Sequence, residues 1–157
     1  MDLYLIVKTL HILSATILFG TGLGIAFFFF LPHWQGRSVE ERLAAARTTV
    51  TADFMFTLPS GVIQPLSGLW LIWHGGYAVT EPWLLATYAL YILAGLCWLP
   101  VVWIQIRLKQ MLIQQVSGQR IDQKNYDRLY RLWFILGWPA FVGLIIIFAL
   151  MVAKPSW

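Results

Sequence analysis

Four long stretches without charged residues limit the folds that are open to this chain. They contain 24, 27, 25 and 22 residues without Asp, Glu, Lys or Arg, and they lie between Lys8 and His33, Asp53 and Glu81, Glu81 and Arg107, and Arg131 and Lys154. A helix rises 1.5 Å per residue, so about 20 apolar residues cross a hydrocarbon core of about 30 Å. The sequence therefore predicts an all-α membrane protein, a bundle of four transmembrane helices.

The predicted spans divide a single integral membrane domain, residues 1–157, into membrane and loop segments. The spans cover residues 3–31, 50–74, 82–106 and 131–153, and the two long loops cover residues 32–49 and 107–130. Only 11% of the residues are charged, whereas a soluble domain carries roughly 25%. The lipid bilayer is therefore the main surrounding of this chain.

Basic residues are concentrated in the two long loops. Eight of the eleven Lys and Arg residues lie there, and Arg131 follows directly after the second loop. The positive-inside rule places such loops in the cytoplasm, and hence both termini on the non-cytoplasmic side. The net charge of +4 is explained by this topology, and we expect no nucleic-acid partner.

Proline and capping residues mark the expected helix boundaries. Pro32 is expected to end the first span, and the Ser38–Glu41 segment has the capping-box pattern that restarts a helix. Pro59 and Pro65 are expected to interrupt the second span, which indicates a surface that faces protein rather than lipid. The polar residues of that surface are Ser60, Gln64 and Ser67.

Tryptophans are frequent near the predicted span ends. Interfacial belts favour Trp at the level of the lipid headgroups. The five that fit this pattern are Trp34, Trp73, Trp83, Trp133 and Trp157.

His11 is the strongest candidate for a functional residue inside the membrane, where ionisable groups are costly. Lys8 and Ser14 share its helix face at three-residue spacing. A neutral imidazole can bind haem iron through one nitrogen, and Lys8 is placed to pair with a porphyrin propionate. The alternative is a structural histidine bonded to a neighbouring helix, with Lys8 extending to the interface.

A charge pair is predicted near the cytoplasmic ends of the spans. Asp53 begins the second span, and Arg107 and Arg131 lie at a comparable depth on the third and fourth. An Asp–Arg pair there would neutralise charge and fix the helix register; a role for Asp53 in proton transfer is the alternative. Gln64, Gln105 and Tyr88 are further candidates for a polar interior.

Gly20 and Gly24 form a Gly-x-x-x-Gly pair in the first span. Small residues four apart let two helix backbones approach closely in lipid. We therefore predict a helix-packing groove at these glycines, which could also make room for a flat cofactor beside His11.

Several segments resemble known membrane families. The chain is similar over nearly its whole length to an uncharacterised family of bacterial predicted integral membrane proteins. The segments that carry this resemblance are 18–28, 64–71, 82–86, 99–103 and 137–141. The opening Val7–Leu13, followed by Phe19-Gly20, more distantly resembles the first helix of HemJ-type protoporphyrinogen oxidases and CopD-like membrane proteins.

These resemblances imply a multi-pass protein of the bacterial inner (cell) membrane, and a haem b held by His11 in a HemJ-like redox role. The HemJ pattern has a lysine early in the third span, whereas the residues here read Leu84-Leu85-Ala86-Thr87-Tyr88. That departure weighs against porphyrinogen oxidation and leaves haem binding as the implied property. The alternative is a non-enzymatic accessory subunit or small-molecule carrier, acting as a homo-oligomer or with a membrane-complex partner.

The predicted topology can be tested with reporter fusions. Alkaline phosphatase fused after Trp157 should be active, because this enzyme folds only outside the cytoplasm and the C-terminus is predicted there. The same reporter fused after Gln119, in the loop 107–130, should be inactive. The reverse pattern would overturn the orientation.

Overall fold

Residues 2–155 are described by a computed structural model, in which helices form nearly the whole chain. In chain order the elements are α1 (Leu3–Trp34), α2 (Val39–Ala52), the π-helical segment η1 (Asp53–Thr57), α3 (Leu58–His74), α4 (Pro82–Val116) and α5 (Gln123–Ala153). Since α2, η1 and α3 follow one another without a break, they form one long helix. The prediction of four helices that are long and apolar enough to cross a membrane is therefore confirmed.

Most of the expected boundaries agree with the structure. The Ser38 hydroxyl accepts from the backbone of Glu41, and the Glu41 carboxylate accepts from the backbone of Ser38, as in a capping box. Pro32 and Pro65 are the exceptions, because α1 continues through Pro32 to Trp34 and α3 continues through Pro65 to His74. At Pro65, the Gly61 carbonyl that the proline leaves without an N–H accepts from the Tyr91 hydroxyl instead. Pro32 lies in the last turn of the helix, where its missing N–H removes a single hydrogen bond and the chain soon leaves the helix anyway.

The second membrane helix passes Pro59 by widening one turn. In η1 the N–H of Leu58 donates to the carbonyl of Asp53, a bond across five residues rather than four. A π-bulge of this kind changes which residues face a neighbouring helix and is frequent at functional sites. Beyond it, Ser60 and Ser67 are buried, so the prediction that this surface faces protein is confirmed.

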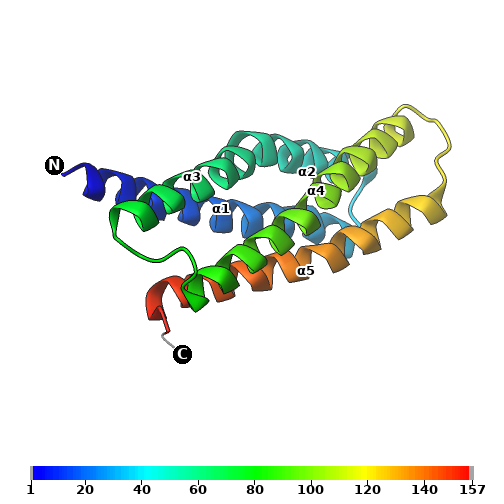
Figure 1. The fold of residues 1–157 in the computed structure, drawn as a ribbon. Helices are drawn as coiled ribbons and strands as arrows, with labels where there is room; N and C mark the ends of the chain where they lie inside the picture. The colour runs from blue at the N-terminus through cyan, green and yellow to red at the C-terminus, as the bar shows by residue number, and fades with distance from the viewer. Residues whose placement is uncertain (1, 156–157) are drawn as a thin grey trace.

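The bundle consists of two helix pairs rather than four equally packed helices. Figure 1 shows α1 beside α3 and α4 beside α5, with both termini at one end of the molecule. The pairs are joined chiefly through α2, which packs against α1 and α4 near the opposite end. Toward the termini the pairs diverge, and α3 and α4 are linked there by residues 75–81.

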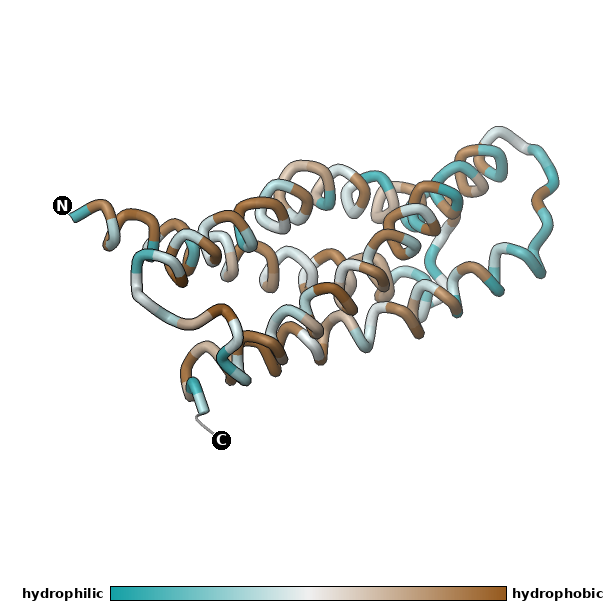
Figure 2. Tube along the Cα trace, in the orientation of Figure 1, coloured by the Kyte–Doolittle hydropathy of each residue, from teal (hydrophilic) through white to brown (hydrophobic). Residues whose placement is uncertain are grey.

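The packed core is divided in the same way. A large cluster lies at the end near α2 and combines α1, α2, α4 and α5; its most buried members are Ala46, Ile104, Leu108, Leu112 and Tyr126. A smaller cluster of Ile72, Trp83 and Leu84 lies at the end with the termini. Figure 2 shows apolar residues along the helices and polar residues gathered at the end near the two long loops.

Only part of the predicted tryptophan belt agrees with the structure. Trp34 and Trp73 are exposed, as an interfacial position requires. Trp83 and Trp133 are buried, so their assignment to the belt is wrong: each packs between helices, where its indole ring fills core volume. Trp157 lies outside the described residues.

Candidate ligand cavity and polar sites of the bundle

Polar side chains join α1 to α3 around His11. Its Nδ1 lies 2.8 Å from the hydroxyl oxygen of Ser67. The Gln64 amide donates to the backbone carbonyl of His11 at 2.7 Å and also to the hydroxyl of Ser14. Because lipid offers no hydrogen-bond partners, these contacts satisfy the polar groups and fix the two helices against each other.

The bond from His11 to Ser67 determines which ring nitrogen carries the proton. The Ser67 hydroxyl lies 2.6 Å from the carbonyl oxygen of Ile63, to which it donates. Its oxygen therefore accepts from Nδ1–H of His11, and Nε2 keeps its lone pair. Within residues 2–155, Nε2 makes no hydrogen bond. An imidazole oriented in this way through its second nitrogen is the arrangement that metal-binding histidines use.

The residues predicted to assist His11 are not gathered into one site. Ser14 is buried beside His11, but it accepts from Gln64 and donates to the His11 carbonyl, so it serves helix packing. Lys8 is exposed, and its Nζ lies 5.9 Å from the centre of the Tyr4 ring.

Gly68 lets the His11 ring approach α3 closely, because glycine has no side chain. The sequence analysis did not predict this role for Gly68. A Cβ placed on Gly68 would lie 3.2 Å from Cε1 of His11, closer than a relaxed carbon–carbon contact. The ring of His11 thus packs directly against the backbone of α3. The sequence shows Ser67 and Gly68 close after Gln64, but their contact with His11 becomes apparent only when α1 and α3 are placed side by side.

Asp53 forms the second polar centre, at the start of η1. Its carboxylate is 2% exposed. Trp98 donates to Oδ1 at 3.3 Å. With the Gln105 amide turned to satisfy both of its neighbours, its nitrogen donates to Oδ2 of Asp53 at 2.6 Å and its oxygen accepts from the Trp133 indole at 3.2 Å. One chain of hydrogen bonds therefore joins η1, α4 and α5.

The predicted pairing of Asp53 with Arg107 or Arg131 is wrong. Among the described residues, the ion pair that forms is Arg37–Glu41, at 3.8 Å on the surface. Arg107 is exposed and donates to Gln110 on its own helix, and Arg131 is exposed on α5. The physical reason is the rotation of the residues about the helix axes: Asp53 is buried between helices, whereas both arginines lie on exposed faces.

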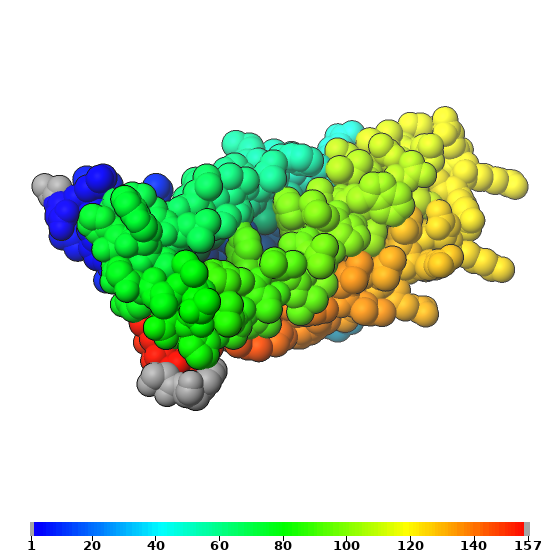
Figure 3. Space-filling model, in the orientation of Figure 1, coloured from blue at the N-terminus to red at the C-terminus, as the bar shows by residue number. Residues whose placement is uncertain are grey.

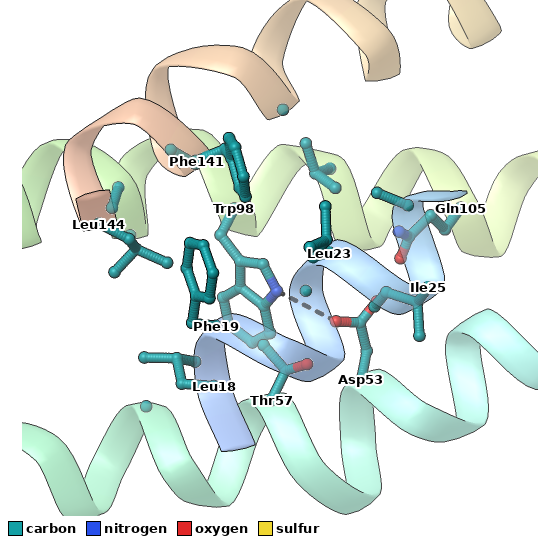
Figure 4. A pocket seen from close by; sticks show the side chains of 18 of the residues that line it. Leu18, Phe19, Leu23, Ile25, Asp53, Thr57, Trp98, Gln105, Phe141 and Leu144 are labelled. Carbon is teal, nitrogen blue, oxygen red and sulfur yellow. Dashed lines mark hydrogen bonds between the residues drawn. The ribbon is translucent and has the colours of Figure 1, made fainter. Parts of the chain in front are cut away.

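A cavity of about 590 Å³ lies between the two helix pairs, with Asp53 and Gln105 in its wall. Figure 4 shows the Trp98 indole pointing to Asp53. Phe19 and Phe141 lie in the same wall and stack on each other with ring centres 5.2 Å apart. Apart from Asp53, Thr57, Gln105 and the polar atoms of Tyr and Trp, the wall is apolar. Small-molecule sites have this size and this mixture of an apolar lining with a few polar groups.

Glycines create much of this space. The wall contains one glycine from each membrane-crossing helix: Gly22, Gly61, Gly95 and Gly137. A Cβ on Gly22, Gly95 or Gly137 would meet no atom within 4 Å, so these three border empty volume. The predicted close packing of helices at Gly20 and Gly24 is wrong, since a Cβ on either residue would meet no atom within 4 Å.

Comparison with known proteins assigns the chain to a family. Residues 5–155 match the model of the family described as Predicted integral membrane protein (DUF2269), and the chain belongs to this family. The protein is thus an integral, multi-pass membrane protein with a helical bundle. No curated protein and no solved structure matches it.

The packing of His11 on Gly68 makes a prediction about stability. Gly68→Ala should lower the melting temperature in detergent, because the added methyl group meets the imidazole at 3.2 Å and overpacking costs about 1–3 kcal/mol. Adding His11→Ala should restore part of the loss. Gly24→Ala is the matched control and should leave stability equal or higher, because its Cβ meets nothing within 4 Å. Equal melting temperatures for the Gly68 and Gly24 variants would contradict the described packing.

Proposed function

We propose that this protein binds a small apolar molecule in the cavity between its two helix pairs and acts as a carrier or receptor for it in the membrane. The observation that carries the proposal is the cavity of about 590 Å³ inside a bundle of only four membrane helices. A recess of this size, open on one side to the surface, is within the range of small-molecule sites. Its volume, with a glycine from every membrane helix in the wall, favours binding over a purely structural role.

The route into the cavity supports a ligand that arrives from the bilayer. Several wall residues also belong to the outer surface: Val62 on α3 is 52% exposed and Leu99 on α4 is 61% exposed. The cavity therefore reaches the surface between α3 and α4. In Figure 3 the space between these helices is hollowed, with α1 visible in its depth. Since these helices are the ones long and apolar enough to cross a membrane, the opening faces lipid.

A second candidate is the binding of haem b by His11, and the fixed tautomer of its ring favours it. Nδ1 donates to Ser67, which leaves Nε2 available for iron. The cavity itself does not fit this cofactor, because its wall contains no His, Cys, Met, Lys or Arg to bind iron or a propionate. A haem on His11 would therefore lie outside the cavity, against the surface of the α1–α3 pair, with Lys8 nearby.

The membrane in question is, in our proposal, the bacterial inner membrane, with the basic loops in the cytoplasm. In this arrangement the divergent end of the helix pairs lies on the outer side. The cavity then lies deep in the bilayer, and Asp53 lies toward the cytoplasmic end of it.

The cavity proposal predicts saturable binding of a neutral apolar probe, 1,1,1-triphenylethane, to the protein in lipid nanodiscs, measured against empty nanodiscs. Gly95→Leu should weaken binding at least about tenfold, because the new side chain enters the cavity without a clash. The control Gly20→Leu should bind as the wild type does, because Gly20 is exposed and lies outside the cavity wall. Equal loss in both variants, or no saturable binding, would contradict the proposal.

The haem proposal predicts a Soret band in protein purified from haem-replete cells. His11→Ala should abolish the band, while Ser67→Ala should weaken or shift it, because the imidazole loses the partner that orients it. His74→Ala is the control and should keep the spectrum, since His74 stacks on Trp70 and Tyr4 and takes no part in the hydrogen bonds of His11. A colourless wild-type protein would rule out this candidate.

A further inference from the structure

The hydrogen bonds that reach Asp53 suit its ionised form. The indole N–H of Trp133 can only donate, so the oxygen of the Gln105 amide must face it. The nitrogen of the same amide must then face Asp53, and it donates to Oδ2. Trp98 donates to Oδ1. Both oxygens therefore accept hydrogen bonds, which is the pattern of an ionised carboxylate rather than of a carboxylic acid.

That carboxylate has no positive partner in the described part of the chain. Its hydrogen-bond donors, Trp98 and Gln105, are both neutral, and no Lys, Arg or His contributes to the cavity wall. A buried charge without a counter-charge is strongly unfavourable in a membrane protein. Either a proton or a bound cation must supply the missing charge.

The cavity offers what an organic cation needs beside this carboxylate. Aromatic rings in its wall can hold a cation over their faces; they include Phe19, Tyr91, Trp98, Trp138 and Phe141. The hydroxyl of Thr57, one turn from Asp53, is buried at 6% exposure. It lies in the wall and can accept a hydrogen bond from an ammonium group.

We propose that the ligand is a lipophilic organic cation and that Asp53 is its counter-ion, which releases a proton to solvent when the cation binds. This inference rests on the proposed function of the cavity and names the ligand class. Apolar groups of the cation would occupy the volume bordered by the glycines, and its charge would lie at the end of the cavity that holds Asp53 and Thr57.

Within residues 2–155, the groups that bond to Asp53 do not titrate near neutral pH. Its neighbours are Thr57 on its own segment and, on α4 and α5, the non-titrating Trp98, Gln105 and Trp133. The residues that α1 contributes to the wall are apolar as well. Tyr91 is the second titratable residue of the wall, and its hydroxyl donates to the carbonyl of Gly61.

The test compares two probes of nearly the same shape. Methyltriphenylphosphonium carries a permanent positive charge, and 1,1,1-triphenylethane is its neutral counterpart. In nanodiscs the wild-type protein should bind the cation more tightly than the neutral probe. Asp53→Asn should weaken binding of the cation at least about tenfold, to the affinity of the neutral probe. Binding of the neutral probe should not change, because the amide keeps the size of the carboxylate but not its charge.

A measurement on the wild-type protein gives an independent test that needs no variant. The probe does not titrate, so any pH dependence of its binding comes from the protein. As the pH is lowered and Asp53 becomes protonated, the affinity for the cation should fall about tenfold per pH unit, as expected for one proton exchanged per cation. Cation binding that does not change between pH 4 and 9 would overturn the inference.

The outcomes separate this inference from the cavity proposal. In one outcome, the neutral probe binds saturably and Gly95→Leu abolishes this binding, while the wild type and Asp53→Asn bind the cation equally well. This outcome overturns the cation inference and keeps the cavity proposal. Absence of saturable binding for both probes overturns both. A preference for the cation that is lost in Asp53→Asn supports both.

Discussion

A bilayer supplies no hydrogen-bond partners, so polar side chains within the spans bond to the backbone of their own helix or pair with a group on another helix. In this protein those pairs connect the elements one by one. His11 and Ser67, with Gln64 and Ser14, join α1 to α3. Asp53 is joined to α4 through Trp98 and Gln105, and Gln105 to α5 through Trp133. The polar contacts thus set the register of a bundle whose remaining surface is apolar and would pack in several ways.

The two polar centres have different consequences. Around His11 the helices approach until the imidazole touches Gly68, and little volume is left. Around Asp53, Trp98 bonds to the carboxylate, and glycines line an open cavity between the helix pairs. The same requirement for satisfied polar groups therefore produces a closed joint between α1 and α3 and an open cavity between the pairs.

Sequence reasoning was most accurate where the physical signal is local. The charge-free stretches gave the four membrane helices, and Ser38 with Glu41 gave the start of α2. It was wrong where the answer depends on helix rotation. Asp53 is buried between helices, whereas the arginines at similar depth lie on exposed faces and do not pair with it. Trp133 and Trp83, expected at the interface, are buried because their faces point toward neighbouring helices.

The sequence by itself determined the class of protein: hydrophobic length and charge placement depend on residue type and order alone, and they suffice for a multi-pass membrane bundle. It also singled out His11 and Asp53, because ionisable residues in apolar stretches are rare and costly. The tertiary structure decided what each of them contacts. Which faces meet, whether a glycine borders a neighbour or empty space, and where a carboxylate finds its donors all depend on distances between segments far apart in the chain. The cavity therefore becomes visible only when the four helices are placed together.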